Sequence, residues 1–126
     1  MTYDISINPD KGYISIIVIG NIDNAKAMSI NIEAHELGRK HNIRKYLMDL
    51  RDARNIEDVM QNYNFAYKDM KADDRIDRSA VVALVVSPED HSHDFIETVA
   101  LNTGLNVRLF RDLMEAEIHL IGMQSK

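Results

Sequence analysis

The chain contains no cysteine and no tryptophan, and it has only two prolines and five glycines among its 126 residues. Without cysteine it can form no disulfide, no thiolate nucleophile and no cysteine-ligated zinc or iron–sulfur site. The few glycines are too dispersed to form a glycine-rich phosphate-binding loop, and no serine lies in a Gly-x-Ser-x-Gly motif. These absences exclude several common catalytic and cofactor-binding designs.

Long apolar runs and an excess of positive charge are absent as well. No stretch reaches the ~18 apolar residues that a transmembrane helix needs, and residues 1–10 lack the basic and apolar segments of a signal peptide. Fifteen lysines and arginines against twenty acidic residues give a net charge of -5, which argues against binding to the phosphate backbone of nucleic acid. We therefore expect a cytoplasmic protein with no nucleic-acid partner.

The composition itself is that of one globular domain. Hydrophobic residues make up 45% of the chain and charged residues 28%, and 126 residues is a common length for a domain with one core. No linker, internal repeat or low-complexity segment divides the sequence. We expect a single domain over residues 1–126.

Alternating apolar and polar residues predict a β-hairpin at the start of the chain. Tyr3, Ile5 and Ile7 alternate with polar neighbours, as in a strand with one wet face. Residues 8–12 (NPDKG) favour a turn, and residues 13–19 are apolar enough for a strand that is buried on both sides. The first strand is therefore expected at the edge of a sheet.

Helices and strands alternate along the rest of the chain. Apolar spacing and capping residues predict helices at residues 23–41, 55–72, 95–104 and from 112 onward. Short apolar runs predict strands at residues 45–50, 80–86 and 107–110. The run at residues 80–86 (AVVALVV) is typical of a central strand covered on both faces. The order β-β-α-β-α-β-α-β-α requires crossover connections, so we expect an α/β fold with a mostly parallel sheet and an antiparallel N-terminal edge strand.

The last third of the chain shows a family resemblance. Residues 95–117 (FIETVALNTGLNVRLFRDLMEAE) combine a helix that ends at a glycine, a strand that ends in a phenylalanine and an acid, and a final helix with a Glu-Ala pair. This section resembles the closing section of SpoIIAA-like (STAS-like) proteins, and the order of elements over the whole chain agrees with theirs. Leu120 stands near the position where many members have a tryptophan. The resemblance implies a STAS/SpoIIAA-like fold with strands adjacent in chain order.

The resemblance also implies a role without catalysis. Members serve as signalling antagonists, as transporter appendages or as proposed binders of small molecules and lipids. The anti-sigma-factor antagonists among them have a phosphorylatable serine after the strand that corresponds to residues 45–50. Here the corresponding stretch, residues 49–58, has no serine, threonine or glycine, so we expect that phosphoswitch to be missing.

Asp49 lies late in a predicted strand, as the phospho-acceptor of response-regulator receivers does. A receiver also needs an acidic pair after its first strand and a lysine after its last strand. This chain has Gly20-Asn21 and Arg111-Asp112 at those places. We therefore interpret Asp49 as an acceptor of hydrogen bonds from amides of the loop that follows it.

Residues 91–94 (HSHD) bring two imidazoles and a carboxylate close together, which is ligand chemistry that metal sites use. A structural zinc needs four ligands, however, and no His-Glu-x-x-His spacing accompanies the cluster. Residues 87–90 (SPED) have the form of a capping box with proline at the first helical position, so the cluster is interpreted as the start of a helix. We expect no metal and no cofactor. A small hydrolase or a metal-dependent enzyme that uses residues 91–94 stays as an alternative.

A ligand site is expected at the carboxyl ends of the parallel strands, where helix N-termini offer unpaired N–H groups. The loops at these ends are residues 20–24, 51–55 and 87–93. We predict a ligand-binding site formed by Asp52, Arg54, Asn55, Ser87 and His91.

The leading functional hypothesis is a non-catalytic regulatory domain that binds a small molecule or a lipid, or a regulatory protein partner. The apolar stripe of the helix at residues 55–72 is interpreted as core filling in preference to a lipid pocket. The edge strand at residues 2–8 and the apolar helix faces allow a homodimer. A protein-interaction adaptor without a small ligand is the other alternative.

Overall fold

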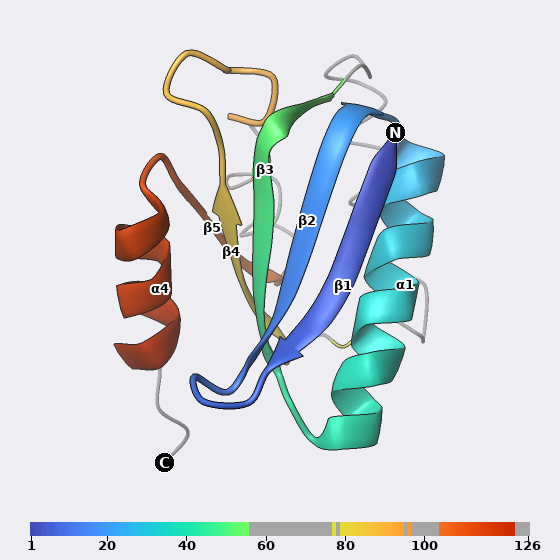
Figure 1. Ribbon diagram of the computed structural model, residues 1–126, viewed down its shortest axis with the longest axis vertical. Helices are drawn as coiled ribbons and strands as arrows, with labels where there is room; N and C mark the ends of the chain where they lie inside the picture. The colour runs from blue at the N-terminus through green and yellow to red at the C-terminus, as the bar shows by residue number, and fades with distance from the viewer. Residues whose placement is uncertain (56–76, 78, 95, 97–103, 123–126) are drawn as a thin grey trace.

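The computed structural model describes residues 1–55, 77, 79–94, 96 and 104–122. Their elements are β1 (Thr2–Asn8), β2 (Tyr13–Ile22), α1 (Asn24–His41), β3 (Lys45–Asn55), β4 (Val81–Val85), β5 (Asn106–Phe110) and α4 (Leu113–Gly122) (Figure 1). The helices predicted at residues 55–72 and 95–104 fall largely outside the described residues, although Asn55 itself belongs to β3.

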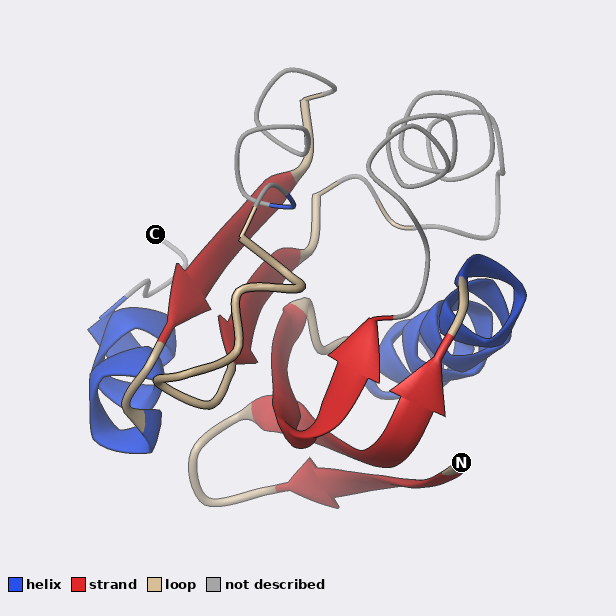
Figure 2. Cartoon of the chain, turned by 90° about the horizontal axis from the view of Figure 1, so that it is seen from above, coloured by secondary structure: helices blue, strands red, loops and turns tan. Residues whose placement is uncertain are grey.

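The strands form one five-stranded sheet in the order β1-β2-β3-β4-β5. Strand β1 pairs with β2 in the antiparallel sense, and the three pairs from β2 to β5 are parallel. Helix α1 covers one face of this sheet and α4 covers the other (Figure 2). The predicted mostly parallel sheet, its antiparallel N-terminal edge and its strands adjacent in chain order are all confirmed.

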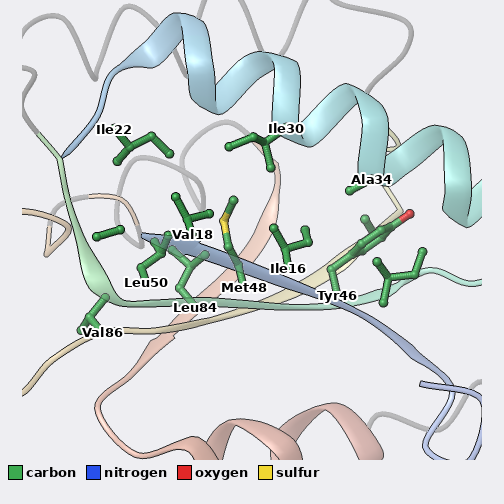
Figure 3. Close-up of a cluster of buried hydrophobic side chains, with 13 residues drawn as sticks. Ile16, Val18, Ile22, Ile30, Ala34, Tyr46, Met48, Leu50, Leu84 and Val86 are labelled. Atoms are coloured by element: carbon green, nitrogen blue, oxygen red, sulfur yellow. The ribbon is translucent and has the colours of Figure 1, made fainter. Parts of the chain in front are cut away.

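The core lies on both faces of the sheet, because the central strands are apolar at successive positions. The cluster under α1 includes Ile14, Ile16, Val18, Ile30, Ala34, Tyr46, Met48, Leu50, Leu84 and Val86 (Figure 3). The smaller cluster under α4 contains Tyr13, Leu47, Ala83, Val85, Ala116 and Leu120. Strand β4 contributes to both clusters, which confirms its prediction as a strand covered on both faces.

Helix α1 begins and ends where its capping residues predict. The side chain of Asp23 accepts a hydrogen bond from the amide of Lys26 at 2.8 Å, and Asn42 adopts a left-handed conformation with φ 56°. Within the helix, Gly38 leaves room for Tyr46, since a Cβ at Gly38 would overlap the tyrosine hydroxyl. No helix in the described part of the chain is both long enough and apolar enough to span a membrane.

Helix α4 is capped by Asp112, whose Oδ1 accepts from the amide of Met114 at 3.1 Å, as predicted. Its inner face buries Ala116 and Leu120 completely. Ile121 directly follows Leu120 but is 40% exposed, because successive residues of a helix lie about 100° apart and Ile121 therefore leaves the inner face.

Two of the predicted loops belong to strands, so that part of the prediction was wrong. Strand β2 extends to Ile22 and β3 extends to Asn55, and their pairing continues over residues 19–22 and 52–55. Polar residues at these positions suggested loops, but a strand end at the rim of a sheet tolerates them when their side chains face water. Residues 20–22 and 51–55 are therefore extended sheet.

The helix start predicted at residues 87–90 was wrong as well. The Ser87 hydroxyl donates to the carboxylate of Glu89 at 2.7 Å, and the amide of Asp90 donates to the carbonyl of Ser87 at 3.1 Å. Residues 88–89 and 92–94 thus form turns, and no helix begins at Pro88. The local bond from serine to the neighbouring carboxylate competes with the capping arrangement that the sequence suggested.

Candidate functional site

A hollow of about 380 Å³ opens at the carboxyl end of the sheet. The ends of β2 and β3 form two of its walls, and the turn that follows β4 forms the third; all of them lie at the same end of the molecule (Figure 1). The hollow is lined by Gly20, Asn21, Arg51, Asp52, Ala53, Arg54, Ser87, Glu89 and Asp90. Its wall is dominated by charged and polar side chains.

A β-bulge directs the side chains of β3 toward this hollow. Between the pairs Ile17–Asp49 and Ile19–Asp52, strand β3 advances three residues while β2 advances two. Arg51 and Asp52 are consequently both exposed, although they are consecutive in a strand. Bulges commonly redirect side chains next to binding sites, and this one concentrates charge at the rim of the sheet.

The charge of Arg51 is already balanced by Asp49. The guanidinium of Arg51 donates to both carboxylate oxygens of Asp49, at 2.9 Å from Nε and 2.7 Å from Nη2. The amide of Arg51 also donates to Asp49, at 3.1 Å, as predicted for that aspartate. Burial alone would raise the pKa of Asp49, but these bonds from Arg51 hold it below its ordinary value.

Arg54 is the more exposed of the two arginines that line the hollow. Its side chain is 70% exposed, and its Nη1 lies 3.8 Å from Oδ1 of Asp90, which is beyond hydrogen-bond distance. The guanidinium has five N–H donors in a planar fork. Arg54 lines the hollow and is largely exposed, so its guanidinium can receive an anionic group.

Two carboxylates and a hydroxyl complete the rim of the hollow. The Ser87 hydroxyl donates to Glu89, and this bond lowers the pKa of the Glu89 carboxyl below its ordinary value. Asp52 is an exposed carboxylate on β3. The hollow therefore presents both signs of charge within one small volume.

Hydrogen bonds fasten the turn after β4 to the end of β3. The amide of Asn55 donates to Oγ of Ser92 at 3.2 Å, and the amide of Ser92 donates to Asp90 at 2.9 Å. His93 is buried, and its Nε2 lies 3.3 Å from the carbonyl oxygen of Ala53 and 3.6 Å from Asp90. Burial lowers the pKa of His93, so the ring stays neutral near neutral pH.

Asp90 lies at the centre of this network. Burial is the largest influence on its pKa and raises it, but the bonds from Ser92 and the nearby His93 and Arg54 together bring the pKa below the ordinary value. Its side chain is only 12% exposed. Asp90 therefore mainly holds the wall of the hollow in place, and little of its carboxylate is available to a ligand.

The two histidines of residues 91–94 face different partners. His91 lies outside the hollow, where its Nδ1 is 2.6 Å from Oδ2 of Asp94, while His93 is buried beneath Ala53. Within the described ranges, no three His, Asp or Glu side chains are arranged to hold a metal ion.

The structure brings three of the five predicted site residues together. Asp52, Arg54 and Ser87 line the hollow. Asn55 instead fastens the neighbouring turn through its backbone amide, and His91 lies outside. The prediction missed Arg51, Glu89 and Asp90, which line the hollow, and Arg111, which holds its wall. Arg111 directly follows β5, so the rule that placed the other loops at strand ends could have found it.

Comparisons with known proteins bear on the fold alone. No protein-family model matches the chain, and no curated protein matches it. Among solved structures, it is similar to the crystal structure of an uncharacterised DUF3478-family protein with a SpoIIAA-like fold from Shewanella loihica PV-4. The similarity covers 94% of this chain and 92% of that chain, with 15% sequence identity and a TM-score of 0.50. The chain has a SpoIIAA-like fold, as its closing segment predicted.

Proposed function

We propose that this protein is a non-catalytic binding domain whose ligand is a small polar molecule held by Arg54 in the hollow at the carboxyl end of the sheet. The proposal depends on the exposure of Arg54 and on its loose pairing with Asp90. Its guanidinium is 70% exposed at the hollow, and its ion pair with Asp90 spans 3.8 Å. Arginine recognises carboxylate and phosphate groups through paired N–H donors, so an anionic group is the natural occupant.

Arg51 supports this assignment by contrast. Its guanidinium makes the two-point bond to Asp49 that Arg54 lacks. Two arginines therefore lie at the same rim. The guanidinium of Arg51 is already bound to Asp49, whereas that of Arg54 is available to a ligand. The ligand's anionic group is accordingly assigned to Arg54.

The surrounding carboxylates restrict the charge of the ligand. Asp52, Glu89 and Asp90 line the same hollow, and two unit charges about 4 Å apart repel each other by about 1 to 4 kcal/mol in water or near a protein surface. A group with a single negative charge is favoured over a phosphate dianion. We therefore propose a carboxylate-bearing ligand.

The composition of the wall favours a polar molecule over an acyl chain. Among the described residues that line the hollow, only Gly20 and Ala53 lack a polar side chain. The alternative lipid pocket considered for the helix at residues 55–72 lies outside the described residues. The described hollow thus supports the small-molecule form of the binding hypothesis.

The state of Ser87 favours binding over hydrolysis. A serine nucleophile needs a general base whose pKa lies near the working pH. The partner of Ser87 is Glu89, whose pKa is below its ordinary value, so it accepts the serine proton poorly. This is the physical support for proposing a non-catalytic role.

Native mass spectrometry of protein purified gently from its host tests the proposal. We expect a small molecule to remain bound in one-to-one ratio to the wild-type chain and to be lost from the Arg54→Ala variant. Arg44→Ala is the matched control: Arg44 is also exposed but precedes β3, about 30 Å from Arg54 along the extended strand.

Three outcomes would count against the proposal. Retention of the molecule by Arg54→Ala would reject this site, and equal loss from Arg44→Ala would show that the effect of arginine removal is not local. A chain that carries no small molecule but retains a protein partner would favour the adaptor alternative.

A further inference from the structure

One arginine outside the hollow holds the turn that forms its third wall. Nη1 of Arg111 donates to the carbonyl oxygens of Ser87 at 2.8 Å and Asp90 at 3.0 Å, and it lies 3.4 Å from that of Pro88. Nη2 of Arg111 donates to Oδ1 of Asp94 at 2.5 Å. A single guanidinium therefore connects both halves of the turn segment at residues 87–94.

The position of Arg111 follows from the sheet register. Phe110 pairs with Val85 at the end of the β4–β5 ladder, and its carbonyl accepts one more bond from the amide of Val86 at 2.9 Å. Arg111 is the next residue, so it leaves β5 level with the start of the turn. Its side chain is 33% exposed, so solvent reaches these bonds only in part.

The turn has no regular backbone ladder of its own to fix its shape. Its amides make turn bonds at 3.1 Å from Asp90 to Ser87 and 3.3 Å from Asp94 to His91. A hydrogen bond from a charged guanidinium to a carbonyl oxygen is stronger than one from a neutral donor. Arg111 thus adds charge-assisted bonds to a turn whose two backbone bonds lie near or beyond the long end of the usual range.

The turn has two separate attachments with different effects. Ser92 and His93 hold its far half to the end of β3. Arg111 holds its near half, which carries Ser87, Glu89 and Asp90 into the hollow. The distance between Arg54 and the wall opposite therefore depends on the β5 attachment.

We propose that Arg111 is a positioning residue of the hollow: it fixes the turn that carries Ser87, Glu89 and Asp90 and so sets how these groups face a ligand on Arg54. This inference rests on the proposed function for its meaning, since it concerns the same hollow. Its structural content can be tested without any ligand.

The test compares Arg111→Ala, Arg111→Lys and a matched control, Arg108→Ala, which removes an exposed arginine three residues earlier, within the same strand. Amide hydrogen exchange reports local opening at individual residues. We expect Arg111→Ala to accelerate exchange at the amides of Asp90 and Ser92 by roughly tenfold or more, the effect of losing about one or two charge-assisted bonds.

The Arg111→Lys variant and the Arg108→Ala control make the interpretation of the exchange rates more specific. Arg111→Lys keeps the charge but not the planar fork, so it should recover part of the protection. Arg108→Ala should leave both amides within about twofold of wild type, because surface substitutions usually have small effects. Amides of the β3–β4 ladder should exchange alike in all four proteins, which separates a loosened turn from a destabilised fold.

A second readout uses acetate as a probe of Arg54, followed by the shifts of backbone amide resonances. The turn carries the carboxylates of Glu89 and Asp90 as well as Ser87, so its loosening should change the acetate affinity of Arg111→Ala, whereas Arg108→Ala should keep the wild-type affinity. Unchanged exchange at Asp90 and Ser92 would overturn the positioning role, and so would loss of acetate binding without any change in exchange. If the wild type binds no acetate, the proposed ligand is wrong, but accelerated exchange in Arg111→Ala would still support the positioning role.

Discussion

The two ends of β3 differ in how they hold a polar side chain: near the amino end His35 is enclosed by packed neighbours, whereas near the carboxyl end Arg54 lies at an open hollow. Near the amino end of β3, His35 is 4% exposed and stacks on the ring of Tyr46, with the ring centroids 4.7 Å apart. Near the carboxyl end of the same strand, Arg54 is 70% exposed.

We therefore assign stability to the amino end of β3 and, as proposed above, ligand binding to its carboxyl end. Near the amino end of β3, the ring of His35 accepts a hydrogen bond at Nδ1 from the amide of Asp77, at 2.8 Å. At the carboxyl ends the strand pairing is interrupted by a bulge, and Arg54 keeps donor capacity for a molecule from outside. Substitutions at the first end should change the free energy of unfolding, and substitutions at the second should change binding.

Acid should produce the largest effect, through His35. Burial lowers the pKa of His35 to about 4 in the folded protein, against its ordinary value of 6.5, while Asp77 raises it and Arg39 lowers it slightly. Between these values the unfolded chain binds a proton that the folded chain does not. The free energy of unfolding should therefore fall by about 3 kcal/mol as the pH drops from 6.5 to 4.

Urea denaturation at a series of pH values measures this loss. A His35→Gln variant removes the titrating group, so its stability should change less over that range than the stability of the wild type. If the free energy of unfolding depends on pH identically in the wild type and in His35→Gln, His35 does not cause the loss of stability.

Gly38→Ala should produce the next largest effect. A Cβ at this position would overlap the hydroxyl of Tyr46 and lie 2.7 Å from the carbonyl oxygen of Ile43. Overpacking of this kind costs about 1 to 3 kcal/mol or more, and the better helix propensity of alanine returns less than about 1 kcal/mol. We expect the free energy of unfolding to fall by a net amount of about 2 kcal/mol, as measured by chemical denaturation.

Gly122→Ala is the matched control, because a Cβ at this helical glycine would meet nothing within 4 Å. It should leave stability unchanged or slightly improved. Equal effects from the two glycine substitutions would refute the account of packing at the amino end.

Tyr13→Phe should lower the free energy of unfolding by about 1 kcal/mol, the usual net contribution of one hydrogen bond. The hydroxyl of Tyr13 donates to Glu117 at 2.7 Å and so ties the start of β2 to α4. Burial, together with the bond and charge of Glu117, raises the pKa of Tyr13 to about 12. The comparison is Tyr3→Phe, whose exposed hydroxyl donates to Glu33 at 3.4 Å and should contribute much less in the same thermal melts.

Arg54→Ala should have the smallest effect on stability, within about 0.5 kcal/mol, because exposed and loosely paired charges contribute little. Arg51→Ala should cost about 1 kcal/mol, since it removes the two-point bond to Asp49. Melting curves of the two variants check the ranking. A larger loss from Arg54→Ala would mean that this arginine is structural, and the distinction between the two ends would fail.

Local rules predicted the framework of the fold from the sequence. Alternation identified β1, and the uninterrupted run at residues 80–86 identified β4, because apolar burial dominates both patterns. The capping residue Asp23 predicted the start of α1, and the helical spacing ran out near residue 41, where α1 ends. Such features depend on neighbours in the chain, which a sequence displays directly.

The details that shape the hollow depend on pairing between distant segments. Residues 51–55 are polar and resemble a loop, and only their register with residues 19–22 makes them a bulged strand. The role of Arg111 follows from carbonyl groups more than 20 residues away in the chain. Three of the predicted site residues were nevertheless placed at the hollow, because the carboxyl ends of neighbouring parallel strands must share one edge of the sheet.

An acetate titration followed by the backbone amide resonances tests directly whether Arg54 receives an anionic group in the hollow. We expect shifts concentrated at residues 20–21, 51–54 and 87–90, lost in Arg54→Ala and kept in Arg44→Ala. Shifts that lie elsewhere, or that persist unchanged in Arg54→Ala, would contradict this role of Arg54.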